Sequence, residues 1–196
     1  MKRSTVCLAM LSVALLATSV AVAGVAPGDK APAFTLTDHE GREVSLADFA
    51  GKVVVLEWTN PDCPFVQRHD KQGTMKNLAA AYADKGVVWL TVNSTHYMDR
   101  EANAGYAKRL DLKVPVLVDA DGTVGKLYGA VTTPHMYILD QKGIVVYNGA
   151  IDDDPRGTKG EGVVNHVEVA LDSLLAGTSV EVAQTKPYGC TVKYKE

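Results

Sequence analysis

The sequence contains few cysteines, and no cluster of basic residues is visible in it. Its 196 residues include three cysteines, Cys7, Cys63 and Cys190, and the net charge is −3 at pH 7. This charge pattern does not suit binding to nucleic acid or to an anionic membrane surface, so we expect neither as a partner. The chain also has no glycine-rich phosphate loop, internal repeat or low-complexity tract, and it therefore offers no support for nucleotide use or a repeat architecture.

The first 23 residues have the order of a secretory signal. Lys2 and Arg3 precede a largely apolar run over residues 6–22, and Ala21 and Ala23 are small residues where signal peptidase requires them. An uncleaved membrane anchor is the alternative, because the run approaches spanning length, although serine and threonine dilute it. We expect residues 1–23 to be removed and the mature protein to be exported, to the periplasm or outside the cell, without membrane attachment.

Cleavage would remove Cys7 and leave Cys63 and Cys190, an even number that makes a disulfide possible in an exported chain. The remaining length suits one domain with a full hydrophobic core and is short for two. We expect this domain over residues 24–177, followed by a C-terminal tail over residues 178–196 that carries Cys190.

The domain is organised around a buried strand that leads into a cysteine. Residues 53–58 are apolar except for Glu57, and this pattern predicts a central strand covered on both faces. Pro64 suits the first position of a helix, which makes Cys63 the cap residue. The free N–H groups and the dipole of that helix favour the thiolate, so Cys63 is the candidate nucleophile. The alternative is an inert buried cysteine.

Strand and helix patterns alternate along the rest of the domain. Strands are expected in an N-terminal hairpin near residues 34–36 and at 87–92, 116–118, 137–139 and 144–147. Helices are expected at 64–83, interrupted at Gly73, and at 99–110 and 163–175. This order predicts an α/β fold with a mixed sheet and helices on both faces. Because parallel strands end at one edge, Cys63 should lie beside residues 93–96 and 133–135.

Several motifs together resemble one family. They are Gly-Asp-Lys-Ala-Pro at 28–32, Trp-Thr-Asn-Pro-Asp-Cys-Pro-Phe-Val at 58–66, Asp-Ala-Asp-Gly at 119–122, Thr-Pro at 133–134 and Leu-Asp-Gln-Lys-Gly at 139–143. From residue 27 to about residue 177 the chain resembles a peroxiredoxin-like subgroup of the alkyl hydroperoxide reductase and thiol-specific antioxidant family of redoxins. The resemblance implies a thioredoxin-like three-layer α/β/α fold with a mixed central sheet and an N-terminal β-hairpin.

The chain departs from the family patterns at the reactive cysteine. Thioredoxins carry Cys-x-x-Cys, and Val66 stands here at the second cysteine position. Peroxiredoxins carry Pro-x-x-x-Thr/Ser-x-x-Cys, and this chain has Leu56 and Asn60 at the proline and hydroxyl positions. The neighbouring resolving thiol and the usual peroxidatic pattern are therefore both absent.

The resemblance also implies roles for three residues near Cys63. Thr133 and a cis Pro134 should lie across from the cysteine and bind a substrate chain. Glu57 matches the buried acid that thioredoxins place under the active cysteine, and burial should raise its pKa, so that it exchanges a proton with sulfur. The alternative is a structural carboxylate whose charge is satisfied by a helix N-terminus or a lysine.

Three functions remain open on the sequence. The first is an exported thiol–disulfide oxidoreductase in which Cys63 attacks a protein or small-molecule disulfide, with a thiol as electron donor. The second is a thiol peroxidase that reduces a hydroperoxide through a sulfenic acid. The third is a non-catalytic binding or copper-carrying module, with His135 and Cys63 as ligands. We expect no cofactor and no resident metal.

The tail carries the thiol that position 66 lacks. The chain from residue 176 to residue 190 spans roughly 46 Å when extended, enough for Cys190 to reach Cys63. Val192 and Tyr194 alternate in a way that suits anchoring of the tail. The sequence thus predicts a reversible Cys63–Cys190 disulfide, within one chain or between two, and a permanent stabilising disulfide is the alternative.

Overall fold

The computed structural model describes residues 24–196, so the predicted signal peptide lies outside the described residues. The strands are β1 (Thr35–Asp38), β2 (Glu43–Ser45), β3 (Val53–Trp58), β4 (Val87–Asn93), β5 (Val116–Val118), β6 (Thr132–Thr133), β7 (His135–Leu139), β8 (Val145–Gly149) and β9 (Cys190–Thr191). The helices are η1 (Leu46–Phe49), α1 (Pro64–Gln72), α2 (Thr74–Ala83), α3 (Arg100–Leu110), α4 (Thr123–Tyr128) and α5 (His166–Leu175). Within this part of the chain, no helix combines the length and apolar character needed to cross a membrane.

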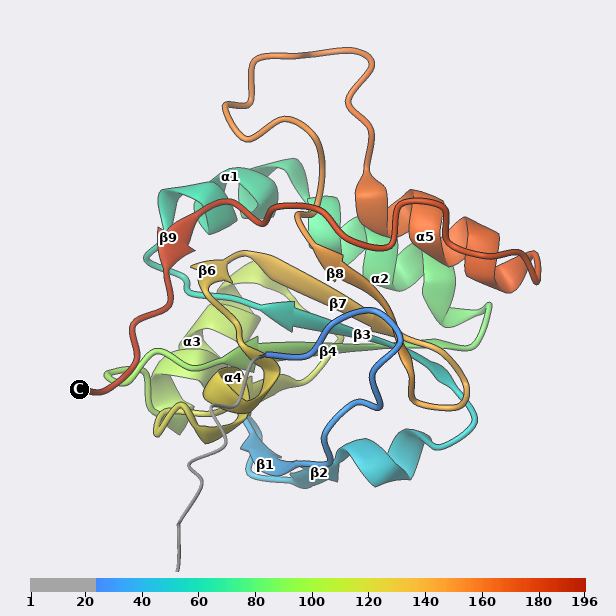
Figure 1. The fold of residues 1–196 in the computed structure, drawn as a ribbon. Helices are drawn as coiled ribbons and strands as arrows, with labels where there is room; N and C mark the ends of the chain where they lie inside the picture. Colours follow the sequence, from blue (N-terminus) through green and yellow to red (C-terminus); the bar gives the residue numbers. More distant parts are fainter. Residues whose placement is uncertain (1–23) are drawn as a thin grey trace, which may run out of the picture.

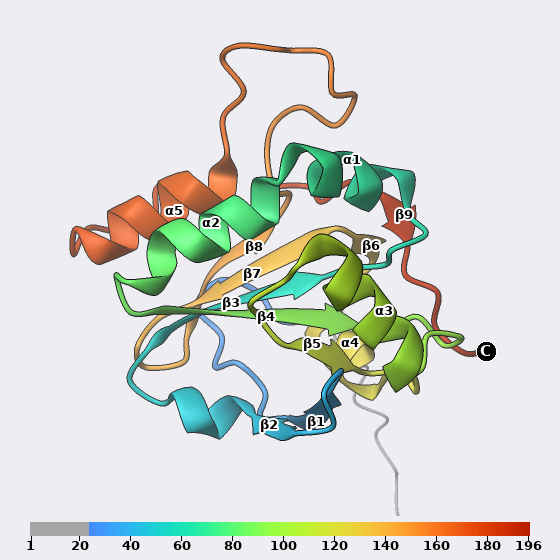
Figure 2. The same ribbon diagram turned by 180° about the vertical axis from the view of Figure 1, so that it is seen from behind.

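A seven-stranded mixed sheet forms the middle layer, in the order β2-β1-β5-β4-β3-β7-β8. Strand β3 pairs parallel with β4 and antiparallel with β7. Helices α1, α2, α3 and α5 lie on one face of the sheet, and α4 and η1 lie on the other (Figures 1 and 2). The expected three-layer α/β/α architecture with an N-terminal hairpin is confirmed.

Strand β3 is the centre of the core, and all six of its residues are buried. Its side chains alternate between two apolar clusters because successive residues of a strand point to opposite faces. Leu56 and Trp58 pack with Tyr128 on the α4 side, whereas Val55 packs with the residues of α2 and α5. Two-sided burial explains the unbroken apolar run that marks this strand in the sequence.

The two helices that follow β3 are separated at Gly73, as the sequence predicts. Gly73 has φ 68°, in the left-handed region, and its N–H bonds to the carbonyl oxygens of His69 and Asp70 at the end of α1. Glycine suits this position because other residues are strained there. The resulting bend turns the chain from α1, which begins at the cysteine, into α2, which packs on β4.

Among the helices, one predicted start differs from the structure by three residues, and one helix was not predicted. Helix α5 begins at His166 rather than 163, because the Asn165 side chain accepts a hydrogen bond from the N–H of Glu168 and caps the helix. Helix α4 was not expected, since it has six residues between two left-handed glycines, Gly122 and Gly129. Such a short segment has too little periodicity to be recognised from its sequence.

Candidate active site

Cys63 lies where the central strand leads into helix α1. It is the N-cap residue of that helix, with Pro64 in the first turn, and its backbone is extended. Its N–H bonds to the carbonyl oxygen of Asn60 at 2.9 Å, while the Asn60 side chain accepts from the N–H of Asp62. Only 1% of Cys63 is exposed. The turn therefore holds the thiol at the start of the helix, as expected, but other parts of the protein cover it.

The first of these parts is the segment with Thr133 and Pro134. The peptide bond between these two residues is cis. The Cys63 thiol donates to the carbonyl oxygen of Thr133, with 3.0 Å between Sγ and O. The predicted juxtaposition of Cys63 with Thr133 and Pro134 is present.

The second part is the C-terminal tail. Strand β9 pairs antiparallel with β6, and Cys190 lies opposite Thr133 in the register. Thr133, whose carbonyl oxygen accepts from Cys63, is thus the register partner of Cys190, and each thiol shifts the pKa of the other. Both cysteines are free thiols in this structure. Two cysteines separated by more than one hundred positions in the sequence thus meet at one site, next to the cis-proline.

The two thiols are electrostatically unequal. Burial raises the pKa of Cys63, but hydrogen bonds from the Cys190 thiol and the N–H of Val66 outweigh burial, so this pKa lies below its ordinary value. Burial, together with the hydrogen bond and the negative charge of Cys63, raises the pKa of Cys190 to about 11. Cys63 is therefore the more acidic thiol of the pair, and Cys190 is the one that keeps its proton when Cys63 ionises.

The tail is held along much of its length, so its position is specific. Val192 is 5% exposed, and its N–H bonds to the carbonyl oxygen of Val131. Tyr194 donates to the carbonyl oxygen of Ala130 at 2.7 Å. The anchoring roles predicted for Val192 and Tyr194 are present. A close contact at Gly189 was not predicted. A Cβ added there would lie 2.0 Å from the carbonyl oxygen of Thr133.

Glu57 lies on strand β3, on the side of helix α1 that faces a cavity. It is 3% exposed, and its Oε2 accepts from Nε1 of Trp89 at 2.7 Å and from the hydroxyl of Thr91 at 3.4 Å. Burial raises its pKa to about 7, and the charge of Asp70 also contributes. The structure shows no direct hydrogen bond between Glu57 and Cys63 in the described part of the chain.

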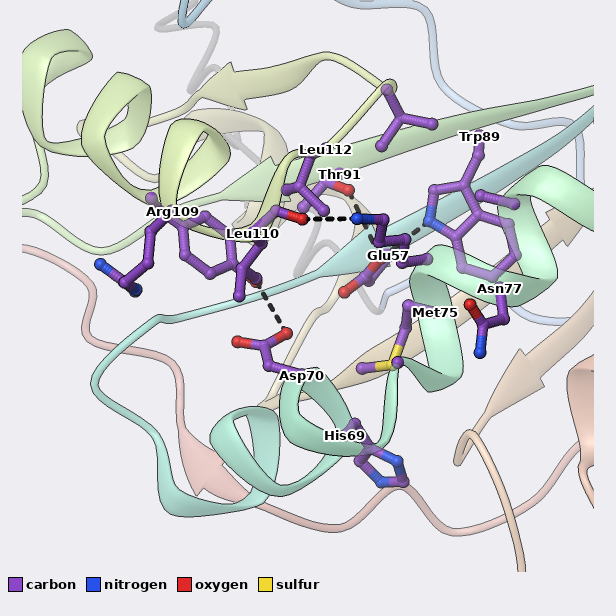
Figure 3. Close-up of a pocket in the computed structure, with 15 residues that line it drawn as sticks. Glu57, His69, Asp70, Met75, Asn77, Trp89, Thr91, Arg109, Leu110 and Leu112 are labelled. Atoms are coloured by element: carbon purple, nitrogen blue, oxygen red, sulfur yellow. Dashed lines mark hydrogen bonds between the residues drawn. The ribbon is translucent and has the colours of Figure 1, made fainter.

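Glu57 and Asp70 line the same cavity of about 350 Å³, between α1, α2 and α3 (Figure 3). Burial raises the pKa of Asp70 to about 6, and its carboxylate accepts from the hydroxyl of Tyr106 at 3.2 Å. Two acids that both titrate near neutral pH thus face one cavity. This cavity and the acid pair were not predicted, because Asp70 lies in a run of polar residues, which is typical of a solvent-exposed helix face.

His135 is directed into the core. Its Nε2 lies 2.8 Å from Oδ1 of Asn148, and its Nδ1 accepts from the N–H of Val131 at 3.4 Å. Burial lowers the pKa of His135 to about 4, so the ring is neutral. Both ring nitrogens have partners, and among residues 24–196 no group of three or more side chains has metal-binding geometry. This arrangement disfavours Cys63 and His135 as a copper site.

The comparison with known families agrees with the fold and with the cysteine motif. Residues 27–148 match the AhpC/TSA family. The chain belongs to this family. The matched region includes Cys63, Thr133 and Pro134 and ends before Cys190, so the tail lies outside it.

The relatives of this AhpC/TSA family protein include one named as a thiol-disulfide oxidoreductase and one named as a peroxiredoxin. The thiol-disulfide oxidoreductase ResA of Bacillus thuringiensis subsp. konkukian is 32% identical over 119 residues, which cover 61% of this chain and 66% of that protein. The match thus spans just under two thirds of that relative. A putative peroxiredoxin of Mycobacterium tuberculosis is 31% identical over 132 residues, 65% of this chain and 79% of that protein.

A solved structure of a hypothetical protein from Sinorhizobium meliloti has a TM-score of 0.79 at 28% identity and covers 88% of this chain and 97% of that one. Solved thioredoxin-like proteins share the fold as well, so the AhpC/TSA family protein has the thioredoxin-like fold that its motifs imply.

Proposed function

We propose that the protein is an exported thiol–disulfide oxidoreductase in which Cys63 is the nucleophile and Cys190 the resolving thiol. One observation carries the proposal: the tail pairs with β6 so that Cys190 lies opposite Thr133, the residue before the cis-proline, whose carbonyl oxygen accepts from the Cys63 thiol. The redox activities named for the family relatives support the same class of chemistry. Export rests on the signal-like residues 1–23.

The reaction divides into two exchanges between sulfur atoms. The Cys63 thiolate attacks one sulfur of a substrate disulfide, forms a mixed disulfide and releases the other substrate sulfur as a thiolate, which takes up a proton. Cys190 then gives up its proton and attacks the Cys63 sulfur, which releases the second substrate thiol and leaves a Cys63–Cys190 disulfide. The substrate has gained two electrons, and an external dithiol or two thiols must return them to the enzyme.

The pKa difference between the two cysteines fits this order of events. Cys63 ionises before Cys190, because its pKa is the lower of the two, so Cys63 is the sulfur that attacks the substrate. Cys190 becomes a nucleophile once the negative charge of Cys63 is lost in the mixed disulfide, since that charge contributes to its high pKa. Charge on one sulfur thus controls the reactivity of the other.

Thr133 and Pro134 would position the substrate, and Glu57 would exchange protons. The backbone next to the cis-proline lies against Cys63 and now pairs with the tail, so an incoming chain would bind there only where the tail gives way. Glu57 is a candidate proton reservoir because its pKa of about 7 lets it gain or lose a proton at neutral pH. Its position on the cavity side of α1 makes any transfer to Cys63 indirect.

A thiol peroxidase is the second candidate, and the burial of Cys63 favours it. With 1% of Cys63 exposed, a hydroperoxide fits the covered site more easily than a folded protein does. The Cys63 thiolate would attack the peroxide oxygen, form a sulfenic acid and release an alcohol or water. Cys190 would then attack that sulfur and release water, giving the same disulfide.

The deciding experiment compares two oxidants on the reduced mature protein. Stopped-flow measurements with 5,5′-dithiobis(2-nitrobenzoate) and with cumene hydroperoxide should show faster oxidation by the disulfide. Mass spectrometry of the product should show an intramolecular Cys63–Cys190 disulfide. A hydroperoxide rate that exceeds the disulfide rate would assign the protein to the peroxidase class.

Single variants separate the two cysteine roles. Cys63→Ser should abolish turnover with both oxidants, whereas Cys190→Ser should accumulate a mixed disulfide or a sulfenic acid at Cys63. Wild-type turnover in Cys190→Ser would refute the resolving role. The reduction potential of the Cys63–Cys190 disulfide distinguishes a catalytic disulfide from a permanent one, because structural disulfides have reduction potentials below about −300 mV.

A further inference from the structure

Tyr188, two positions before Cys190, contacts helix α1 through its hydroxyl and its ring. Its hydroxyl oxygen lies 3.1 Å from Nη2 of Arg68 and 3.0 Å from Nε2 of His69, and its ring lies 5.9 Å from the ring of Phe65, between centroids. All three partners belong to the helix that begins at the cysteine. The tail is therefore attached directly to the element that positions Cys63.

A fourth partner comes from the segment after β8. The Tyr188 hydroxyl donates to Oδ1 of Asp152 at 2.5 Å, and Asp152 is 8% exposed. A phenol has one proton to donate and two lone pairs to accept with, so Asp152, Arg68 and His69 use its full capacity. The bond to a carboxylate is of the charge-assisted type, which is stronger than a bond between neutral groups.

His69 belongs to the same network. Its Nε2 lies 3.0 Å from the Tyr188 hydroxyl oxygen and 3.2 Å from Nη2 of Arg68, and its Nδ1 lies 3.2 Å from the hydroxyl oxygen of Thr74. Burial lowers the pKa of His69, which keeps the ring neutral, and the nearby Asp152 opposes this effect. Arg68 is fixed as well, since it donates to the carbonyl oxygen of Asp154 at 3.0 Å. Arg68 and His69 therefore have hydrogen-bond partners besides Tyr188, and these partners fix the positions at which they bind its hydroxyl.

Cys190 lies between two residues that fix the tail: Tyr188, which contacts helix α1, and Val192, which bonds to Val131. Gly189 lies against the carbonyl oxygen of Thr133 and leaves no space for a shift of the backbone toward β6. We propose that Tyr188 is a positioning residue that docks the tail on helix α1 and thereby holds Cys190 against Cys63. The part of the inference that concerns Cys190 chemistry rests on the proposed function, whereas the docking of the tail over Cys63 does not.

Tyr188→Phe is the direct test, because it keeps the ring against Phe65 and removes only the hydroxyl. Loss of this hydrogen-bonded hydroxyl should increase the population of undocked tail about tenfold or more. When undocking is rare and fast, the alkylation rate of Cys63 follows that population. In a Cys190→Ser background, Tyr188→Phe should therefore raise the rate of Cys63 alkylation by iodoacetamide by about the same factor.

Tyr82→Phe is the matched control. The Tyr82 hydroxyl also donates to a carboxylate, that of Asp172 at 2.6 Å, but this bond joins α2 to α5, and within residues 24–196 the hydroxyl makes no hydrogen bond to the tail. This variant should lose comparable stability and leave Cys63 alkylation unchanged. A general loosening of the fold would instead raise the rate in both variants, and that result would overturn the proposal.

A second readout concerns the chemistry of the pair. With both cysteines present, Tyr188→Phe should shift the equilibrium in glutathione buffers away from the Cys63–Cys190 disulfide about tenfold, because the effective concentration of Cys190 at Cys63 falls. An unchanged alkylation rate in the Cys190→Ser background would refute the docking role, even if the disulfide forms normally. Absence of that disulfide in the wild-type protein would refute the proposed function and leave the alkylation test valid. If Tyr188→Phe does not fold, Asp152→Asn weakens the same bond, and the same two outcomes decide.

Discussion

Replacement of Glu57 by Gln should change the pH dependence of stability in a specific way. The pKa of Glu57 is raised from 4.5 to about 7, mainly by burial. Below about pH 4.5 the folded and unfolded states both hold the proton. Between the two pKa values only the unfolded state releases it, so the free energy of unfolding falls as pH rises, and above about pH 7 this loss is complete.

The size of the effect follows from the shift. One pKa unit corresponds to about 1.4 kcal/mol, so ionisation of Glu57 in the folded protein lowers the free energy of unfolding by about 3 kcal/mol at pH 8. Glutamine has nearly the same shape, and its Oε1 accepts from Trp89, yet it carries no ionisable proton. The variant should therefore gain stability relative to the wild type as pH rises.

Urea unfolding of the reduced proteins between about pH 4.5 and about pH 8 measures this difference. The free energy of unfolding of Glu57→Gln minus that of the wild type should increase by about 3 kcal/mol across the range. Asp70 titrates in the same window and is present in every variant, so the difference contains the titration of Glu57 together with its interaction with Asp70. A pH-independent difference for Glu57→Gln would show that the acid is not desolvated and would refute this reasoning.

Three further predictions concern turnover. Glu57→Gln should alter the exchange rate and its pH profile between about pH 6 and about pH 9, and an unchanged profile would remove Glu57 from proton transfer. Gly189→Ala should displace the tail and raise Cys63 alkylation, since the added Cβ meets the Thr133 carbonyl oxygen, whereas Gly177→Ala, with open space around it, should not. Val66→Cys should restore turnover to Cys190→Ser, because it recreates the Cys-x-x-Cys spacing, and failure to do so would show that position 66 cannot supply the resolving thiol.

Local patterns were sufficient to predict much of this fold. Residues 53–58 could only be a strand buried on both faces, since the apolar run has no polar side to expose. Pro64 defined the start of a helix at Cys63, and Gly73 its interruption, because both residues restrict or permit particular backbone angles. The order of strands and helices then predicted the edge at which Cys63 meets Thr133 and Pro134, and the structure has that arrangement.

The sequence by itself determined which side chains can carry the chemistry: a cysteine at a helix start, a second cysteine in the tail and an acid within the central strand. Only the tertiary structure decided how they meet. The route of the tail depends on the hydroxyl of Tyr188 finding Asp152 and His69, and on Gly189 fitting against Thr133. These contacts join distant segments and leave no local periodicity, so no pattern within the tail could reveal them.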